Sequence, residues 1–274
     1  MSSLKAEIGI FGGSGFYSLL ARPRKIDIAT PYGHPSGKIT VGDFGGRKIA
    51  FLARHGEKHT LPPHKIPYRA NLWAFKKLGV KRIIAPCASG SLTPKIKPGD
   101  FVICDQFVDR TTGRRDTFFD GPSVAHAPMA DPYCPELAKI SGQACAKLKI
   151  PYHNEGTIVV ISGPRFSTRA ESKWFQSQGW QVVNMTAYPE MALARELTIC
   201  YLNIALITDY DTGLEGFQDI KPVTAAEVSK TFQKNNQKLK SLLAAMIKII
   251  PPKRTCACGH SMDNALIAFS HLII

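Results

Sequence analysis

Short apolar runs bounded by glycine, proline or charged residues recur along the chain and predict buried strands. The first covers residues 7–11 and runs into Gly12, as expected of a strand that enters a tight turn. Residues 38–41 and 48–53 flank Gly45 and Gly46, which is a hairpin signal. Further strands are predicted at residues 82–85, 101–107, 157–161, 181–183 and 201–207.

Between these runs, apolar residues repeat at helical spacing. Residues 68–78 carry Leu72 and Phe75 on one face, and Gly79 follows as a stop signal. Thr168 and Glu171 form a capping-box pattern at the start of another helix. Helices are therefore predicted at residues 68–78, 135–148, 168–179, 190–197 and 224–250.

Strands that alternate with helices favour an α/β fold with helices on both faces of a sheet. The chain has 274 residues, 44% of them hydrophobic, and no repeat or linker divides it. We therefore expect one domain over residues 1–274, with a Cys-x-Cys tail at about 251–274. No secretory signal and no apolar run of about eighteen residues is present, so a soluble, cytoplasmic protein without a membrane partner is expected.

The formal net charge of +14 predicts an affinity for anions, from nucleic acid down to phosphate. The basic residues are scattered rather than gathered into a tract, and no stacking aromatics are interleaved with them. A basic surface that favours a small anionic substrate is therefore at least as good an interpretation as nucleic-acid binding.

A glycine-rich loop, GGSG at residues 12–15, follows the first strand. Backbone N–H groups in such a loop can wrap an anion, and Ser14 adds a hydroxyl donor. Ser18 stands where a dinucleotide-binding fingerprint needs its third glycine, and the lysine of a Walker A loop is absent. A plain tight turn explains the loop about as well as a phosphate site does.

Arg54 and His55 follow the strand at residues 48–53. The planar guanidinium of Arg54 offers paired donors to phosphate oxygens, and His55 offers another. His55 and His59 have a zinc-like spacing, but Gly56 replaces the glutamate of the zinc-protease motif, so no metal is expected. In isolation, this segment would be interpreted as a solvated charged loop.

Other small or polar segments also follow predicted strands. Ligands in open α/β sheets bind beyond the carboxyl ends of strands, so these segments are candidates for one shared crevice. Two carboxylates after a buried strand are costly unless something donates hydrogen bonds to both. The segments contain Cys87 and Ala88, Phe166, Asn184 with Met185 and Thr186, and Asp209 with Asp211.

Taken in order, these segments resemble the methylthioadenosine phosphorylases of the trimeric purine nucleoside phosphorylase family. The resemblance covers residues 8 to about 242 and implies a mixed, twisted, barrel-like sheet surrounded by helices, assembled as a homotrimer or a dimer of trimers. It is carried by GGSGFY, ARHGEKHTLPPHKIPYRAN, SGSL followed by PGDFV, DQFVDRTT, FFDG, HAPMADPYCP, GPRFSTRAES, NMTAYPE and TDYD.

The resemblance also implies roles for individual residues. The phosphate site would comprise Ser14, Arg54, His55, Cys87, Ala88 and Thr186. The nucleoside site would comprise Phe166, Asn184, Met185, Asp209, Asp211 and His126, the last of these lent to a neighbouring subunit. Inorganic phosphate would be the co-substrate, and no other cofactor is implied.

This sequence departs from the family pattern at three places. Cys87 stands where the family often has threonine, and Thr212 with Gly213 replaces the usual Cys-Trp after TDYD. The tail contains Cys256 and Cys258, which resemble the cysteines in tails of some archaeal members. By that resemblance, disulfides are expected among Cys134, Cys200, Cys256 and Cys258.

The implied reaction is phosphorolysis of 5′-methylthioadenosine, with adenosine as a second substrate, to adenine and 5-methylthioribose 1-phosphate. A protonated Asp209 would donate to N7 of the leaving purine, and Asp211 would accept from the 6-amino group. Three alternatives stay open at this point: a 6-oxopurine phosphorylase of the same family, a dinucleotide-binding oxidoreductase and a basic nucleic-acid-binding protein. Assays with methylthioadenosine, adenosine and inosine would separate a methylthioadenosine phosphorylase from a 6-oxopurine phosphorylase.

Overall fold

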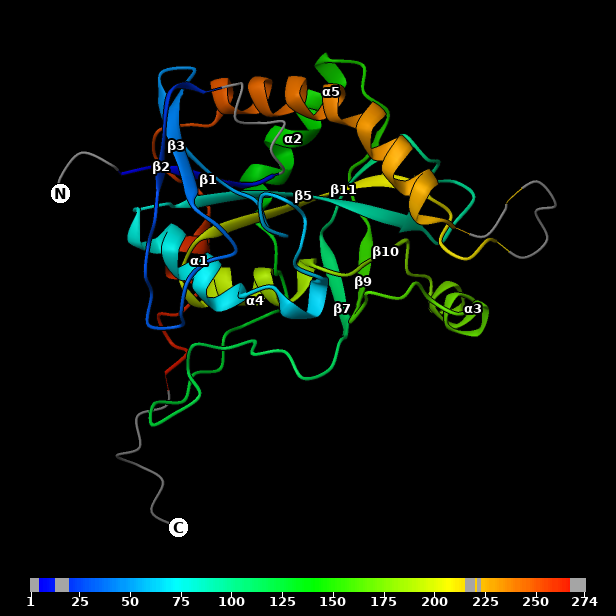
Figure 1. The fold of residues 1–274 in the computed structure, drawn as a ribbon, viewed down its shortest axis with the longest axis horizontal. Helices are drawn as coiled ribbons and strands as arrows, with labels where there is room; N and C mark the ends of the chain where they lie inside the picture. Colours follow the sequence, from blue (N-terminus) through cyan, green and yellow to red (C-terminus); the bar gives the residue numbers. More distant parts are fainter. Residues whose placement is uncertain (1–4, 13–19, 215–219, 221–222, 267–274) are drawn as a thin grey trace, which may run out of the picture.

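The computed structural model describes residues 5–12, 20–214, 220 and 223–266. In this part of the chain, eleven strands form one mixed sheet (Figure 1). Its strands are β1 (Ile8–Phe11), β2 (Ala21–Ile26), β3 (Ile39–Phe44), β4 (Arg47–Leu52), β5 (Arg82–Ser91), β6 (Phe101–Ile103), β7 (Gln106–Arg110), β8 (Tyr152–His153), β9 (Thr157–Ile161), β10 (Val182–Asn184) and β11 (Cys200–Asp209).

Strand β5 is the centre of the sheet because it pairs with three other strands. The main path runs β2-β3-β4-β1-β5-β10-β9-β7. The first residues of β5 pair in parallel with β1, and its last residues pair antiparallel with β10. Strand β11 follows β5 in parallel from Cys200 opposite Arg82 to Asp209 opposite Gly90. This branching confirms the mixed, distorted sheet expected from the sequence.

Five α-helices surround the sheet in the described residues: α1 (Tyr68–Lys77), α2 (Pro135–Lys147), α3 (Arg169–Ser177), α4 (Ala187–Glu196) and α5 (Ala225–Ile249). Helices α1 and α4 pack on one face, and α2 and α5 pack on the other (Figure 1). Alternate residues of β11 enter the two cores, with Ala205 on the α1 and α4 side and Leu206 on the other. Burial on both faces explains the unbroken apolar run of this strand.

The helix start signals are confirmed. Thr168 and Glu171 form a complete capping box at α3, and the Thr224 side chain accepts a hydrogen bond from the Glu227 backbone N–H at α5. Two short 3₁₀ helices, Pro63–Lys65 and Ala257–His260, complete the helical elements of the described residues. None of the described helices combines the length and the apolar character that crossing a bilayer requires.

The sequence pattern missed strands β2 and β8 and misjudged three boundaries. The sequence of β2, ARPRKI, lies on an exposed edge and has no apolar alternation. Strand β5 continues through Ser91 instead of ending at Ala85, because β11 supplies a hydrogen-bonding partner along its whole length. The expected strand at residues 101–107 is two strands, since β6 pairs with β11 whereas β7 pairs with β9. Helix α4 begins at Ala187 rather than residue 190, although Tyr188 has an extended backbone.

Candidate functional site

The carboxyl half of β5 is the axis of the candidate site. Ala88 is the only residue of β5 that is not fully buried, and Asp209 is the only such residue of β11. Both lie at the carboxyl ends of these two parallel strands, where ligands bind in open α/β sheets. A rise of about 3.3 Å per residue separates Pro86 from Gly90 by about 13 Å.

Arg54 lies at the Pro86 end of the axis and is buried. Its Nε and Nη2 donate to the two carboxylate oxygens of Glu190 at 2.5 and 3.0 Å, and its Nη1 donates to the Pro86 carbonyl at 3.1 Å. Burial alone would lower the pKa of Arg54, but the carboxylate of Glu190 outweighs it and raises that pKa. Glu190 thus occupies one fork of the guanidinium and Pro86 one N–H of Nη1, which leaves one N–H on Nη1 and one on Nη2.

Glu190 is a site residue that sequence reasoning missed. Its side chain is fully buried in α4 and also accepts a hydrogen bond from the Tyr201 hydroxyl at 2.8 Å. The only signal in the sequence was a charged residue directly before the apolar run at residues 191–194. Glu190 positions Arg54 with two charge-assisted hydrogen bonds, which are stronger than neutral ones.

His55 is held as a neutral imidazole. Its Nδ1 lies 2.9 Å from the Leu61 carbonyl, so that nitrogen must carry the proton. The ring stacks on His59 with centroids 4.4 Å apart. Burial lowers the pKa of His55 to about 4, and the positive charge of Arg54 lowers it further, although the hydrogen bond to Leu61 opposes both. Nε2 therefore accepts a hydrogen bond at neutral pH, and it becomes a donor to an anion only after taking up a second proton.

Cys87, Asn184 and Thr186 meet in the middle of the axis. Asn184 Nδ2 donates to Cys87 Sγ at 3.0 Å, and Asn203 Nδ2 donates to the same sulfur at 3.3 Å. Asn184 Oδ1 accepts the backbone N–H of Thr186 at 3.4 Å. The Thr186 hydroxyl makes no capping bond to α4, which leaves it available to a ligand. Cys87 Sγ accepts these two N–H groups and donates its S–H to Asn203 Oδ1 at 3.6 Å, so its side chain has no further donor for a ligand.

Met185 is packed closely against the loop that follows β9. A Cβ atom on Gly163 would lie 2.5 Å from Met185 Sδ, so only glycine fits there. Arg114, which sequence reasoning also missed, donates to the carbonyls of Ser162 and Met185 at 3.1 and 2.8 Å and to that of Tyr188. Arg114 therefore ties the ends of β9 and β10 together.

The two carboxylates lie at the Gly90 end of the axis. Asp209 accepts hydrogen bonds from the Thr208 hydroxyl at 2.6 Å and the Asp211 backbone N–H at 2.7 Å. A Cβ atom on Gly90 would lie 2.9 Å from Asp209 Oδ1, so glycine makes room for this carboxyl group. Burial raises the pKa of Asp209 to about 6, while the two hydrogen bonds partly oppose that rise.

Asp211 has an unusual backbone and an unpaired oxygen. Its φ of 54° lies in the left-handed region, which is uncommon for a residue other than glycine. Its Oδ2 atom is buried and has no hydrogen-bond partner among the described residues. Burial raises the pKa of Asp211, and the hydroxyls of Ser172 and Ser167 partly offset this. Such an oxygen is suited to a ligand that brings its own donor.

Two predicted residues, Phe166 and His126, lie apart from this set. Ser14 falls outside the described residues. Phe166 is 37% exposed, and its neighbour Ser167 lies beside Asp211. His126 is exposed, and its backbone N–H donates to the Ala265 carbonyl of the tail at 2.8 Å. The structure thus gathers Arg54, His55, Cys87, Ala88, Asn184, Met185, Thr186, Asp209 and Asp211 around one strand end.

The expectation of disulfides is wrong for this structure. All seven cysteines are free, and the Sγ atoms of Cys200 and Cys256 are 3.4 Å apart. A disulfide bond requires about 2.05 Å.

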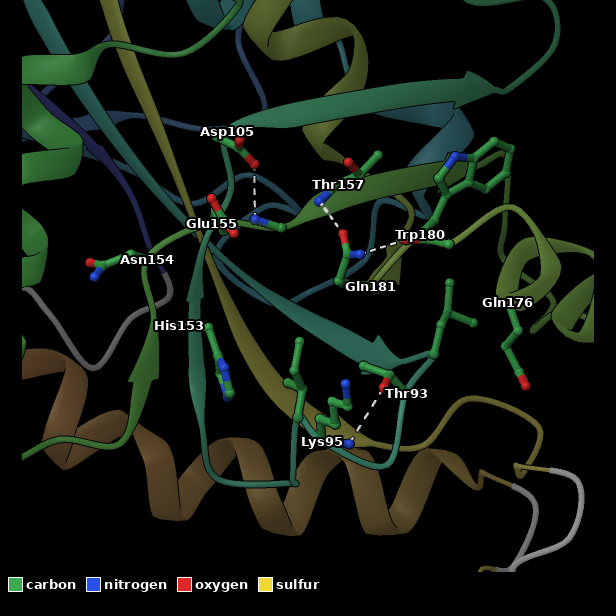
Figure 2. Close-up of a pocket in the computed structure, with 14 residues that line it drawn as sticks. Thr93, Lys95, Asp105, His153, Asn154, Glu155, Thr157, Gln176, Trp180 and Gln181 are labelled. Atoms are coloured by element: carbon green, nitrogen blue, oxygen red, sulfur yellow. Dashed lines mark hydrogen bonds between the residues drawn. The ribbon is translucent and has the colours of Figure 1, made fainter.

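A pocket of about 960 Å³ lies beyond the end of β5, at the amino ends of β9 and β10 (Figure 2). None of the predicted site residues lines it. Its polar groups largely serve the backbone, since Asp105 accepts from the Gly156 N–H and Gln181 from the Thr157 N–H. Figure 2 shows these bonds as dashed lines across the pocket wall. We therefore assign the site to the β5 axis and not to this pocket.

Comparison with known proteins shows the family of this chain. The model of the phosphorylase superfamily matches residues 7–248. The S-methyl-5′-thioadenosine phosphorylase of Thermofilum pendens is 51% identical, over 96% of this chain and 99% of that protein. The enzyme of the same name from Pyrococcus furiosus is 49% identical, over 95% and 99%.

Solved structures of methylthioadenosine phosphorylases are also similar to this chain. A methylthioadenosine phosphorylase from an antarctic soil metagenomic library has a TM-score of 0.91 at 39% identity, covering 97% of this chain and 93% of that one. The Schistosoma mansoni methylthioadenosine phosphorylase in complex with adenine has a TM-score of 0.85 at 36% identity, covering 91% and 93%.

Proposed function

Because this chain belongs to the phosphorylase superfamily, and within it to the S-methyl-5′-thioadenosine phosphorylases, we propose that it cleaves 5′-methylthioadenosine with phosphate. The products are adenine and 5-methylthioribose 1-phosphate, which makes the protein a pentosyltransferase. The observation that carries the proposal is that Arg54 contacts Pro86 and Asp209 pairs with Gly90, two residues that lie about 13 Å apart along β5. That length accommodates phosphate, ribose and purine in a row.

Phosphate occupies the Arg54 end of the axis. The Nη1–Nη2 edge of Arg54, the Thr186 hydroxyl and backbone N–H groups near Ala88 are its donors, with Ser14 as a further ligand. His55 meets phosphate through Nε2, which accepts the O–H of monohydrogen phosphate while the imidazole is neutral. These fixed donors hold the nucleophile in line with the anomeric carbon of the nucleoside.

The glycosidic bond is cleaved next to Met185. A phosphate oxygen attacks C1′ of the ribose, the C1′–N9 bond breaks, and its electron pair moves into the purine. The transition state has oxocarbenium character, and the adjacent phosphate dianion stabilises its positive charge. Met185, held by Gly163 and Arg114, packs against the sugar.

The purine leaves at the Gly90 end of the axis, where Asp209 and Asp211 lie. Protonated Asp209 donates its proton to N7, becomes a carboxylate and regains a proton from solvent after product release. The unpaired Oδ2 of Asp211 accepts a hydrogen bond from the 6-amino group. Phe166 stacks on the ring, and Asn184 orients the loop that follows β10.

We further propose that the protein is cytoplasmic and assembles as a homotrimer or a dimer of trimers. His126 supports the proposed assembly because it is exposed and makes no hydrogen bond or ion pair with the other described site residues of its own chain. In the assembly it reaches the 5′ pocket of a neighbouring subunit.

The deciding experiment measures phosphorolysis of methylthioadenosine, adenosine and inosine with and without phosphate. Cleavage of the first two should require phosphate. Inosine should react with a kcat/KM ~30–150-fold lower, because its 6-oxo group meets an acceptor and loses about 2–3 kcal/mol. A kcat/KM for inosine that equals or exceeds the value for methylthioadenosine would favour the 6-oxopurine alternative.

A further inference from the structure

Four cysteines from three distant segments form a compact cluster. Cys134 precedes α2, Cys200 begins β11, and Cys256 and Cys258 lie in the tail. All four Sγ atoms lie within 4.8 Å of one another. Cys134 and Cys200 are fully buried, and the two tail residues are half-buried against the core between α2 and α5. The reaction proposed above uses none of them.

The sulfur positions match a tetrahedral metal site better than a pair of disulfides. Four thiolates at the usual Zn–S distance of about 2.3 Å have sulfurs about 3.8 Å apart. Cys256 Sγ lies 3.7 Å from Cys134 Sγ and 3.4 Å from Cys200 Sγ. Two disulfides would instead pair each sulfur with one partner at about 2.05 Å. We propose that Cys134, Cys200, Cys256 and Cys258 hold one structural Zn²⁺.

The surroundings suit the negative charge of four thiolates. The backbone N–H of Leu137, in the first turn of α2, donates to Cys134 Sγ at 3.5 Å. A helix N-terminus stabilises a thiolate. The guanidinium of Arg254 donates to the Thr198 carbonyl at 2.7 Å and lies 4.0 Å from Cys200 Sγ. A Cβ atom on Gly259 would lie 2.7 Å from Arg254 Nη2, so the glycine after Cys258 allows Arg254 to approach.

The site joins the tail to the body of the protein. The tail continues from the cluster to Ser261, whose hydroxyl donates to the Arg195 carbonyl at 2.8 Å. It then reaches Ala265, whose carbonyl accepts the backbone N–H of His126 at 2.8 Å. Bound Zn²⁺ therefore fastens the segment that supports the His126 loop.

Metal and thiol counts on the same sample test the proposal. The full-length protein is purified anaerobically without chelator, and zinc and iron are measured by mass spectrometry. Thiols are then counted after denaturation with a chelator and without reductant. We expect about one zinc per chain and seven reactive thiols. Only Cys87, Cys104 and Cys145 would react if the cluster held two disulfides, and that count would overturn the proposal.

Reconstitution and variants complete the test. Reduced, metal-free protein should bind one equivalent of Co²⁺ with the visible bands of a tetrahedral thiolate complex, and Zn²⁺ should raise Tm by ~10 °C. Cys258→Ser should abolish the cobalt bands and the zinc content, whereas Cys145→Ala, outside the cluster, should retain both. Seven thiols with no metal uptake, or iron in place of zinc, would overturn the assignment. The cobalt spectrum of the unmodified protein decides the matter even if Cys258→Ser fails to fold.

Discussion

At the scale of single residues, the site depends on a carboxyl group that the fold keeps close to neutral. Burial of Asp209 raises its pKa to about 6, although Thr208 and the Asp211 backbone both donate to it. An ionised carboxylate would repel electron density building on a departing purine, whereas a protonated one can donate to it. The environment of Asp209 is therefore what qualifies it as the acid.

The pH dependence of the reaction tests this role. The protonated form of Asp209 predominates below pH 6 and the carboxylate above it. The kcat/KM for the nucleoside, measured at a fixed concentration of phosphate dianion, should therefore fall as pH rises through about 6. Asp209→Asn should lower kcat ~10²–10⁴-fold and remove this pH dependence. Asp43→Asn, at an exposed hairpin carboxylate, is the control and should behave as the unmodified protein does. An unchanged kcat in Asp209→Asn would remove Asp209 from the mechanism.

Gly90 makes the second residue-scale prediction. A Cβ atom there would lie 2.9 Å from Asp209 Oδ1 and 3.2 Å from Asp211 Cα, so Gly90→Ala displaces both carboxylates. We expect kcat to drop by ~10–100-fold, since small misplacements of catalytic groups have effects of that size. Gly37→Ala is the matched control, because the nearest atom to its Cβ position is 4.0 Å away. Equal kcat values for the two variants would show that the Gly90 contact is irrelevant.

At the scale of elements, helix α4 contributes the charge that positions Arg54. The pair between Arg54 and Glu190 is buried, with side-chain exposures of 7% and 0%. A buried pair adds little net stability, but removing one partner leaves the other charge uncompensated. The α4 helix and the segment after β4 that contains Arg54 are thereby coupled.

Substitution of Glu190 tests that coupling. Glu190→Gln should lower the free energy of unfolding by about 3–5 kcal/mol, measured by urea denaturation. The control is Glu57→Gln, which breaks an exposed pair with Lys25 and should cost at most about 1 kcal/mol. If both variants lost the same small amount, the buried pair would not be coupling the two elements.

At the scale of the whole molecule, His126 is a predicted site residue with no role in the site of its own chain. His126 is held by the tail, away from the β5 axis, and its role requires a second subunit. The net charge of +14 favours the binding of phosphate but does not specify an assembly. The single-domain organisation and the oligomeric state both stay predictions.

Mixed assemblies test the role of His126. His126→Ala should lower kcat/KM for methylthioadenosine by about tenfold, the effect of one lost hydrogen bond of about 1.4 kcal/mol. Co-refolding with Asp209→Asn subunits should restore activity beyond the sum of the two variants, because some sites then combine an intact Asp209 with a neighbour's intact His126. Strictly additive activity, or a monomeric mass in solution, would contradict shared sites.

The local features of this protein were determined by its sequence. Helix starts such as Thr168 with Glu171 are predictable because capping depends only on neighbouring residues. Buried strands such as β11 are predictable because burial on both faces demands a continuous apolar run. The candidate residues could also be placed at strand ends, since each lies next to a recognisable apolar segment.

Only the tertiary structure decided which of these local pieces meet. The length of β5, the pairing of Arg54 with Glu190 and the carbonyl contacts of Arg114 all join residues far apart in the chain. The four cysteines gather from segments more than fifty residues apart, so no spacing rule could have grouped them. The pKa of Asp209 likewise depends on burial, which is a property of the packed molecule and not of the residues beside it.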